Sequence, residues 1–289
     1  MNKLTAERRA AILSALVEGS SVNSTARMTG CSQVTILRLL ADAGSFSADY
    51  HDLTVRNIRS ERVECDEVWS FVGCKARTKR NGGEGHGDAW IWVALDSDSK
   101  LVVSYLVGER NGAHAEALML DLASRVVAKP QITTDSFAAY RYAVGMAFGA
   151  GVNYAVLHKS YGSPYKGDGR YSPPVCVGCD KDAALGNPDL ERASTSYVER
   201  QNLSLRMGSR RFTRLTNGFS KKIENHAHAV ALHYFHYNFV RKHATLKTTP
   251  AVAAGIATKP LTMLDLVAMI EREEALTGGR LTDYLPAAG

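Results

Sequence analysis

The order of strand-like and helix-like segments after residue 61 limits the fold of this chain more than any other feature of its sequence. Three segments with strand patterns come first, and two of them read as a hairpin around the turn "DSDSK". Helical and strand-like segments then alternate. In order, the segments are strands at 62–74, 89–95 and 101–107, a helix at 113–127, a strand at 130–135, a helix at 136–144 and a strand at 153–158. This order predicts an α/β fold with a mixed five-stranded sheet flanked by helices.

Three acidic residues occupy related places in this predicted sheet. Asp66 lies in the first strand, Asp135 ends the fourth, and Glu199 lies in the helix predicted after the fifth. Taken singly, each has an ordinary explanation: an exposed edge position, a helix N-cap, and a capping box with Ser196. Strands one and four are neighbours in a sheet of this order, so we expect the three carboxylates to converge. Glu67 is left out, because alternation along a regular strand directs it to the opposite face.

Converging carboxylates repel one another, and a hard divalent cation with oxygen ligands relieves that repulsion. We expect two Mg²⁺ ions, with Mn²⁺ as an alternative, held by Asp66, Asp135 and Glu199. Two such ions about 3.5–4 Å apart can stabilise both the attacking and the leaving oxygen when a phosphodiester is displaced. The three acids are therefore predicted to be both metal ligands and catalytic residues.

A run of basic side chains follows Glu199 in the segment "STSYVERQNLSLRMGSRRFTRLTNGFSKK", which spans residues 194–222. Its basic residues are Arg200, Arg206, Arg210, Arg211, Arg214, Lys221 and Lys222. The formal net charge of the whole chain is only +6, so the clustering matters more than the total. Such a cluster predicts a polyanionic partner, and nucleic acid is the commonest one. A solvated basic surface is the alternative.

The first 44 residues have the pattern of an all-α helix-turn-helix module. Gly30 suits a left-handed turn between two helices, and Ser32 is placed to cap the second helix. This arrangement leaves Gln33, Thr35 and Arg38 available for DNA bases or phosphates. The alternative is an ordinary helical hairpin without DNA contacts.

The remaining segments set the predicted domain borders. Residues 45–61 have no sustained period and are predicted to form a linker, whereas residues 62–257 form the catalytic domain. Within that domain, the Gly- and Pro-rich residues 160–192 are predicted to be an inserted surface excursion. Residues 258–289 are predicted to end the chain as a helical tail.

The cysteines and the apolar segments indicate the cellular compartment in which the protein is expected. The 5 scattered cysteines do not form a disulfide framework, which favours a reducing compartment. Cys176 and Cys179 have the spacing of half a zinc site, but no second pair follows, so a loose pair of thiols is favoured. The sequence lacks the apolar core of a signal peptide and any run of about 20 apolar residues. We therefore expect a cytoplasmic protein without a membrane partner.

Three stretches of the sequence resemble the DDE transposases of bacterial insertion sequences, in particular the insertion-sequence-one-like group. They are "CDEVWSFVG" at 65–73, "TTDSFAAY" at 133–140, and the block from "SYVERQNLSLRMG" to "TPAVAAGI" at 196–256. The resemblance covers roughly residues 60–257. It implies a ribonuclease-H-like catalytic domain of the integrase-core type, two Mg²⁺ ions, terminal inverted repeats as the DNA substrate, and the triad Asp66, Asp135 and Glu199.

The expected function is therefore that of a DNA transposase. Such an enzyme cuts phosphodiesters at the ends of the insertion sequence and joins the released 3′-hydroxyls to target DNA. Pairing of two DNA ends favours a homo-oligomer. Two alternatives stay open: a helix-turn-helix DNA-binding regulator with an idle catalytic core, and a ribonuclease-H-like nuclease without strand transfer.

Overall fold

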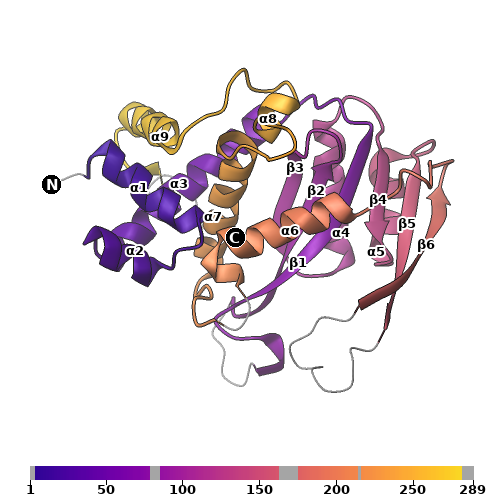
Figure 1. The fold of residues 1–289 in the computed structure, drawn as a ribbon, viewed down its shortest axis with the longest axis horizontal. Coiled ribbons are helices and arrows are strands. Elements are labelled where there is room, and N and C mark those ends of the chain that lie inside the picture. The colour runs from indigo at the N-terminus through magenta and orange to yellow at the C-terminus, as the bar shows by residue number, and fades with distance from the viewer. Residues whose placement is uncertain (1–3, 79–84, 163–174, 214–215, 282–289) are drawn as a thin grey trace. The chain divides into compact units, whose positions relative to one another are not determined.

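The computed structural model describes residues 4–78, 85–162, 175–213 and 216–281 (Figure 1). Contacts between residues divide the chain into two compact units, and the division passes through two strands. The first unit contains residues 1–56, 68–91 and 201–289, and the second contains residues 57–67 and 92–200.

Helices and strands alternate along the chain as follows. The strands are β1 (Arg62–Val72), β2 (Gly87–Asp96), β3 (Val102–Gly108), β4 (Gln131–Asp135), β5 (Tyr154–Gly162) and β6 (Val175–Leu185). The α-helices are α1 (Ala6–Val17), α2 (Val22–Thr29), α3 (Gln33–Thr54), α4 (Gly112–Arg125), α5 (Ala139–Phe148), α6 (Ser196–Gly208), α7 (Ile223–Phe235), α8 (Pro250–Ala253) and α9 (Met263–Thr277). Short 3₁₀ turns lie at Ala76–Thr78 and Arg210–Phe212, and a π-helical turn at His236–Val240 follows α7.

A mixed sheet of six strands has the order β3-β2-β1-β4-β5-β6. Both β1 and β5 run parallel to β4, with Glu64 opposite Thr133 and Asp135 opposite Leu157. The predicted α/β class and the predicted neighbourhood of the first and fourth strands are confirmed. Parallel neighbours have their carboxyl ends at the same edge of the sheet, and this edge is where α/β folds commonly bind ligands.

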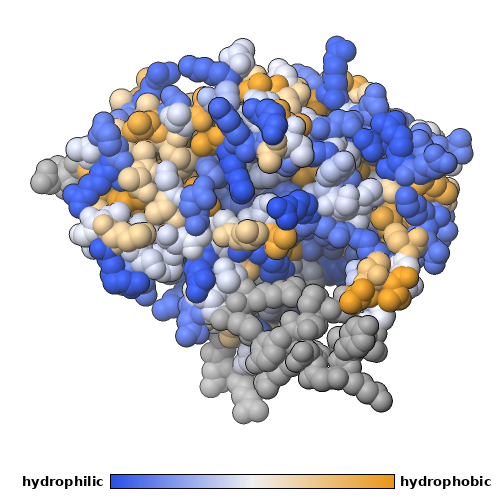
Figure 2. Space-filling view, in the orientation of Figure 1, coloured by the Kyte–Doolittle hydropathy of each residue, from blue (hydrophilic) through white to orange (hydrophobic). Residues whose placement is uncertain are grey.

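The sixth strand differs from the prediction of a five-stranded sheet with an excursion at 160–192. β6 pairs antiparallel with β5, with Leu157 opposite Lys181. Most of its side chains are exposed, so the strand is held by backbone pairing and not by an apolar face. A strand of this kind lacks the hydrophobic alternation that identifies strands in a sequence. Figure 2 shows hydrophobic side chains where β6 begins, and Val175 and Val177 are exposed there.

Aromatic side chains fill the core of the second unit beside the sheet. Trp92 of β2, Tyr140 of α5 and Tyr154 of β5 are almost completely buried. The rings of Trp92 and Tyr140 meet edge to face with their centroids 5.6 Å apart, an arrangement that aromatic pairs favour. α4 packs against both β3 and α5. This packing holds α5 beside the end of β4, where Asp135 lies.

The N-terminal helices of the first unit have the glycine turn and the serine N-cap that the sequence predicts. Gly30 ends α2 with a φ of 66°, and the Ser32 hydroxyl accepts a hydrogen bond from the Thr35 amide at 3.1 Å. At the start of α3, Gln33 and Arg38 are exposed and Thr35 is half-buried. The two predicted helices and the turn between them are confirmed. DNA contact by these residues stays a prediction.

Residues 45–54 differ from the prediction of a linker, because they form the second half of α3. Tyr50 stacks on Phe46 and contacts the rings of Phe235 and Phe239 edge to face. Gly44 allows a close crossing, since a Cβ atom there would lie 2.4 Å from the Cβ of His228 in α7. Packing against α7 therefore stabilises a helix whose own sequence shows no sustained period.

The C-terminal helix α9 packs against α1 and α3 within the first unit. Arg9 of α1, whose side chain is only 5% exposed, forms ion pairs with Glu271 at 3.0 Å and Glu274 at 3.4 Å. The predicted terminal helix is confirmed, and its packing partners are the N-terminal helices. Among the described helices, none has both the length and the apolar character needed to cross a bilayer.

Candidate active site

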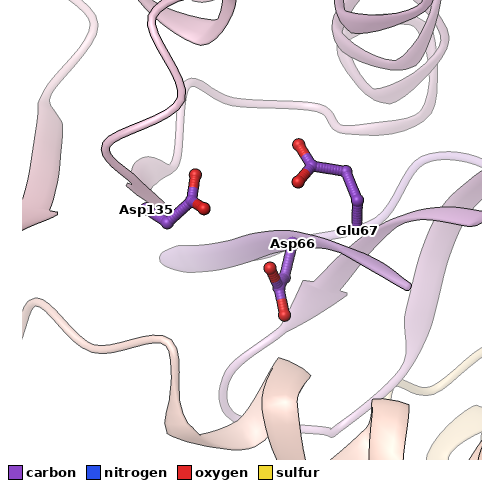
Figure 3. Close-up of side chains that lie close together, drawn as sticks. All are labelled: Asp66, Glu67 and Asp135. Atoms are coloured by element: carbon purple, nitrogen blue, oxygen red, sulfur yellow. The ribbon is translucent and has the colours of Figure 1, made fainter. Parts of the chain in front are cut away.

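Asp66, in the middle of β1, and Asp135, at the carboxyl end of β4, come together on neighbouring parallel strands. β1 pairs with β4 through Glu64 and Thr133, and the two aspartates each lie two residues further along their strands. One carboxylate oxygen from each aspartate and one from Glu67 lie within 4.8 Å of one another (Figure 3). We call these three residues the acidic centre. Two of the three acids predicted to converge therefore do so.

The acidic centre also contains Glu67, which the alternation of side chains along the strand places outside the predicted group of acids. Figure 3 shows the carboxylates of Asp66 and Glu67 pointing in different directions from β1, as alternation along a strand requires. Asp135 reaches this point from the neighbouring strand. At the edge of a sheet, acids on opposite faces can thus approach a common neighbour. The adjacent acidic pair in "CDEV" is the sequence signal that points to this arrangement.

Burial strongly affects the ionisation of Glu67. Its side chain is 2% exposed, and its buried Oε1 atom forms no well-aligned hydrogen bond, although the Tyr140 hydroxyl interacts with the carboxylate. This burial, reinforced by the negative charge of Asp135, raises the pKa of Glu67 to about 7. A buried carboxylate oxygen without a partner is costly unless a proton or a cation reaches it. A positive partner would therefore stabilise the ionised form of Glu67.

Arg110 supplies part of that positive charge, and sequence reasoning missed it. Its guanidinium lies 3.3 Å from Glu67 and 3.6 Å from Asp135. The same group stacks over the Phe137 ring, 4.0 Å from the ring centroid. Arg110 follows β3 and Phe137 follows β4, so two connections of the sheet hold the guanidinium beside the acids. Stacking and paired carboxylates both suit a planar guanidinium.

Glu199 lies in the first turn of α6 and is held apart from the acidic centre. Its Oε1 atom accepts a hydrogen bond from the Thr195 hydroxyl at 2.6 Å and forms an ion pair with the Lys159 ammonium. The Lys159 ammonium also donates to the Thr195 hydroxyl at 2.7 Å. The contact with Thr195 takes the place of the predicted capping box with Ser196. The structure therefore assigns Glu199 a cationic partner that the sequence pattern did not indicate.

Glu64 fixes the helix on which Glu199 lies. Its carboxylate is 2% exposed and accepts hydrogen bonds from the amides of Tyr197 at 2.8 Å and Val198 at 3.0 Å. The Ser97 hydroxyl donates to the other oxygen at 3.3 Å. Amides at the beginning of a helix lack partners within the helix and favour a negative charge. Burial raises the pKa of Glu64, and these donors oppose the effect.

The basic residues after Glu199 divide into two groups. Arg206 donates to the backbone oxygens of Trp69 and Phe212 at 3.2 and 3.3 Å. Arg211 donates to the Ser220 hydroxyl at 3.0 Å, and burial lowers its pKa to about 10. The donors of these two arginines are thus used within the first unit, by backbone oxygens for Arg206 and by a hydroxyl for Arg211. The exposed members are Arg200, Arg210, Lys221 and Lys222, and the predicted contact residue Arg214 lies outside the described residues.

A groove of about 310 Å³ in the first unit unites two predicted DNA-contacting sets. We call it the basic groove, and its lining includes Gln33, Arg210, Arg211, Lys221 and Lys222. Gln33 begins α3, the second helix of the predicted helix-turn-helix, and the four basic residues belong to the segment that follows α6. The sequence places these sets more than 170 residues apart, and no pattern within either set indicates that they meet.

Cys176 and Cys179 lie on β6 as exposed free thiols. Within the part of the chain that the structure describes, neither belongs to a group of ligands with metal-binding spacing. The interpretation of a loose thiol pair stays a prediction. The donor set at the sheet edge is different in kind, because all three of its side chains are carboxylates.

Two comparisons relate this geometry to known proteins. The family model for IS1 transposase matches residues 62–148, a range that contains Asp66, Glu67, Arg110 and Asp135. The chain is also 26% identical over 180 residues to the insertion element iso-IS1n protein InsB of Shigella dysenteriae, which covers 62% of this chain and 94% of that protein. The resemblance seen in the sequence is thereby confirmed: this chain is similar to the IS1 transposases of bacterial insertion elements.

Proposed function

We propose that this protein is a DDE transposase that cuts DNA at the ends of an insertion sequence and joins the ends to target DNA. The observation that carries the proposal is the meeting of Asp66 and Asp135 on two neighbouring parallel strands, where β4 ends beside the middle of β1. We also propose that the sheet, with β1 parallel to β4 and β4 to β5, belongs to a ribonuclease-H-like catalytic domain. DNA ends and target DNA are the proposed partners, and a homo-oligomer brings two ends together.

The residues at the sheet edge fit a divalent cation. Three carboxylates offer oxygen atoms within 4.8 Å of one another, and oxygen is the ligand that Mg²⁺ and Mn²⁺ prefer. The burial of the Glu67 carboxylate, whose Oε1 atom lacks a well-aligned hydrogen bond, is consistent with a proton or a positive group here. Asp66 and Asp135 would hold the cation, and Glu199 would complete the triad after leaving Lys159. A divalent cation at this place supplies Lewis-acid stabilisation to both oxygens exchanged at a phosphodiester.

The chain's own residues prepare the site for a polyanionic substrate. Glu64 fixes the first turn of α6, which sets the position of Glu199 relative to β1. Arg110 keeps a positive charge beside Asp135, where it can face the negative charge of a phosphate. The basic groove of the first unit offers exposed cations to the DNA backbone. Because the DNA is itself the electrophile, no covalent intermediate with the protein is required.

Replacing Asp135 with Asn tests the proposal. We expect the variant to bind DNA as the unchanged protein does and to lose cleavage by about 100-fold or more, since one preorganised charge at the reacting centre is removed. Cleavage is measured on DNA that carries both ends of the element, with Mg²⁺ or Mn²⁺ added. Asp180→Asn on β6 is the matched control, because Asp180 is exposed and lies on the same sheet.

The same assay separates the alternatives. A DNA-binding regulator with an idle core gives no cleavage with either protein, and that result would overturn the proposal. A nuclease without strand transfer cuts DNA but leaves pre-cut ends with free 3′-hydroxyls unjoined to a target duplex. Joined products that depend on Asp135 support the transposase.

A further inference from the structure

We propose that Lys159 is a positioning residue that exchanges Glu199 for a DNA phosphate when the metal site is assembled. This inference rests on the proposed function, because it concerns the state of Glu199 before metal and DNA arrive. In that state the ammonium of Lys159 neutralises Glu199 and keeps it on Thr195. In the assembled state Glu199 binds metal, and the released ammonium contacts the DNA backbone.

The geometry shows a small, closed set of contacts around one carboxylate oxygen. Lys159 of β5 and Thr195 at the beginning of α6 both bind Oε1 of Glu199, and Lys159 also binds Thr195. The Oε2 atom of Glu199 takes no part in these contacts. Thr195 is 2% exposed, so the hydroxyl that organises the set is fixed by its surroundings. Within these contacts, the Thr195 side chain is therefore fixed, whereas the Glu199 side chain can move.

The exposure of the two charged side chains favours exchange over a purely structural ion pair. The Lys159 side chain is 19% exposed, whereas the Glu199 side chain is 47% exposed. Ion pairs open to solvent contribute little to stability, because water screens the attraction. A lysine with a packed stem and an ammonium at the surface is instead a compact point charge that can change partners.

The negative charges of the acidic centre favour the pairing of Glu199 with Lys159 until a metal ion is bound. Asp66, Glu67 and Asp135 already form the acidic centre, and Arg110 balances part of their charge. Adding Glu199 without a cation would bring a further negative charge to that centre, which is unfavourable. Lys159 removes this repulsion while the metal is absent. Once a divalent cation holds Glu199, the ammonium lacks its partner and attracts a phosphate.

The test replaces Lys159 with Gln in the full-length chain, because Gln keeps a polar, packed stem without the charge. Mn²⁺ binding without DNA is measured by calorimetry, and binding to a short DNA duplex of mixed sequence is measured by fluorescence anisotropy in Ca²⁺ over a series of salt concentrations. We expect Mn²⁺ to bind roughly threefold to fivefold more tightly, since a competing cation is lost. We expect the slope of log affinity against log salt to fall by about one, since one phosphate contact is lost.

Control variants make every outcome decisive. Lys159→Arg keeps the charge and restores the salt slope, and Lys159→Met replaces Lys159→Gln if the latter does not fold. An unchanged or weaker affinity for Mn²⁺, or an unchanged salt slope, overturns the inference. Asp135→Asn tests the proposed function separately. If it leaves Mn²⁺ binding intact, the metal site itself is wrong, whereas a loss of Mn²⁺ binding without the expected effect at Lys159 overturns the exchange alone.

Discussion

The acidic centre and the basic groove differ in how their charged side chains are placed and balanced. In the acidic centre, β1 and the end of β4 hold the carboxylates close together, and Arg110 lies 3.3 Å from Glu67 and 3.6 Å from Asp135. In the basic groove, Arg210, Lys221 and Lys222 are exposed, and no ion pair of theirs occurs among the described residues. The first arrangement is suited to a small cation held in fixed geometry. The second suits a flexible polyanion whose counterions are released on binding.

The comparison also separates residues that act from residues that hold the fold. Arg206 and Arg211 have the same charge as the exposed lysines, yet their donors are used by backbone and hydroxyl oxygens. Glu64 likewise resembles the acids of the centre, but its oxygens are used by the amides of α6. Residue type alone therefore does not reveal the role of a charge. The hydrogen-bond and ion-pair partners of a charged side chain in the fold indicate its role.

The largest expected effect is the loss of stability when Glu64 is replaced with Ala. Two helix amides and the Ser97 hydroxyl would lose a buried, charged acceptor, at a cost of about 3 kcal/mol. The free energy of unfolding in urea measures this change. Glu61→Ala is the matched control, because the Glu61 side chain is 75% exposed just before β1. An equal, small effect of both changes would show that Glu64 does not hold α6.

A smaller effect on stability is expected when Glu67 is replaced with Gln, because the ionisation of Glu67 makes the free energy of unfolding depend on pH. Its pKa is about 7 in the folded chain, against an ordinary value of 4.5. A raised pKa means that its favourable contribution is complete below about pH 4.5 and is lost as the pH rises through 7. Glu67→Gln should therefore gain stability relative to the unchanged protein between pH 5 and pH 8, by an amount on the order of 2 kcal/mol.

Unfolding at several pH values without added metal measures that gain, with the exposed Glu191→Gln as the control. If the stability curves of Glu67→Gln and the unchanged protein run parallel over this range, Glu67 is ionised at an ordinary pH. In that case its burial does not distinguish it from the other acids of the centre.

The sequence predicts the pairing of Asp66 with Asp135 because strand order decides it. Two acids at matching positions of adjacent parallel strands must approach each other, whatever the details of packing. Glu67 was missed because alternation predicts the face of a residue but not its distance from a neighbour at the sheet edge. The partnership of Glu199 with Lys159 and Thr195 joins residues from different elements, and no periodic pattern indicates such a contact.

The same distinction applies to the fold. Helices with caps and buried faces, such as α1 and α9, were predicted from local signals. The sequence did not predict the second half of α3, which packing against α7 stabilises. It also did not predict strand β6, which pairing with β5 stabilises. Local sequence predicts elements that carry their own hydrophobic pattern. Elements that depend on a distant partner require the tertiary structure.

The smallest expected effect is on DNA binding by the basic groove. Replacing Lys221 and Lys222 together with Ala removes two exposed charges, and each phosphate contact contributes about 0.9 to the slope of log affinity against log salt. We expect that slope to fall by about two, with an unchanged free energy of unfolding. Lys242→Ala combined with Lys259→Ala is the matched control, since both are exposed lysines of the same unit outside the groove. Equal changes in slope for the two double variants would mean that DNA senses only the total charge of the chain, and the distinction between a focused groove and a generally basic surface would fail.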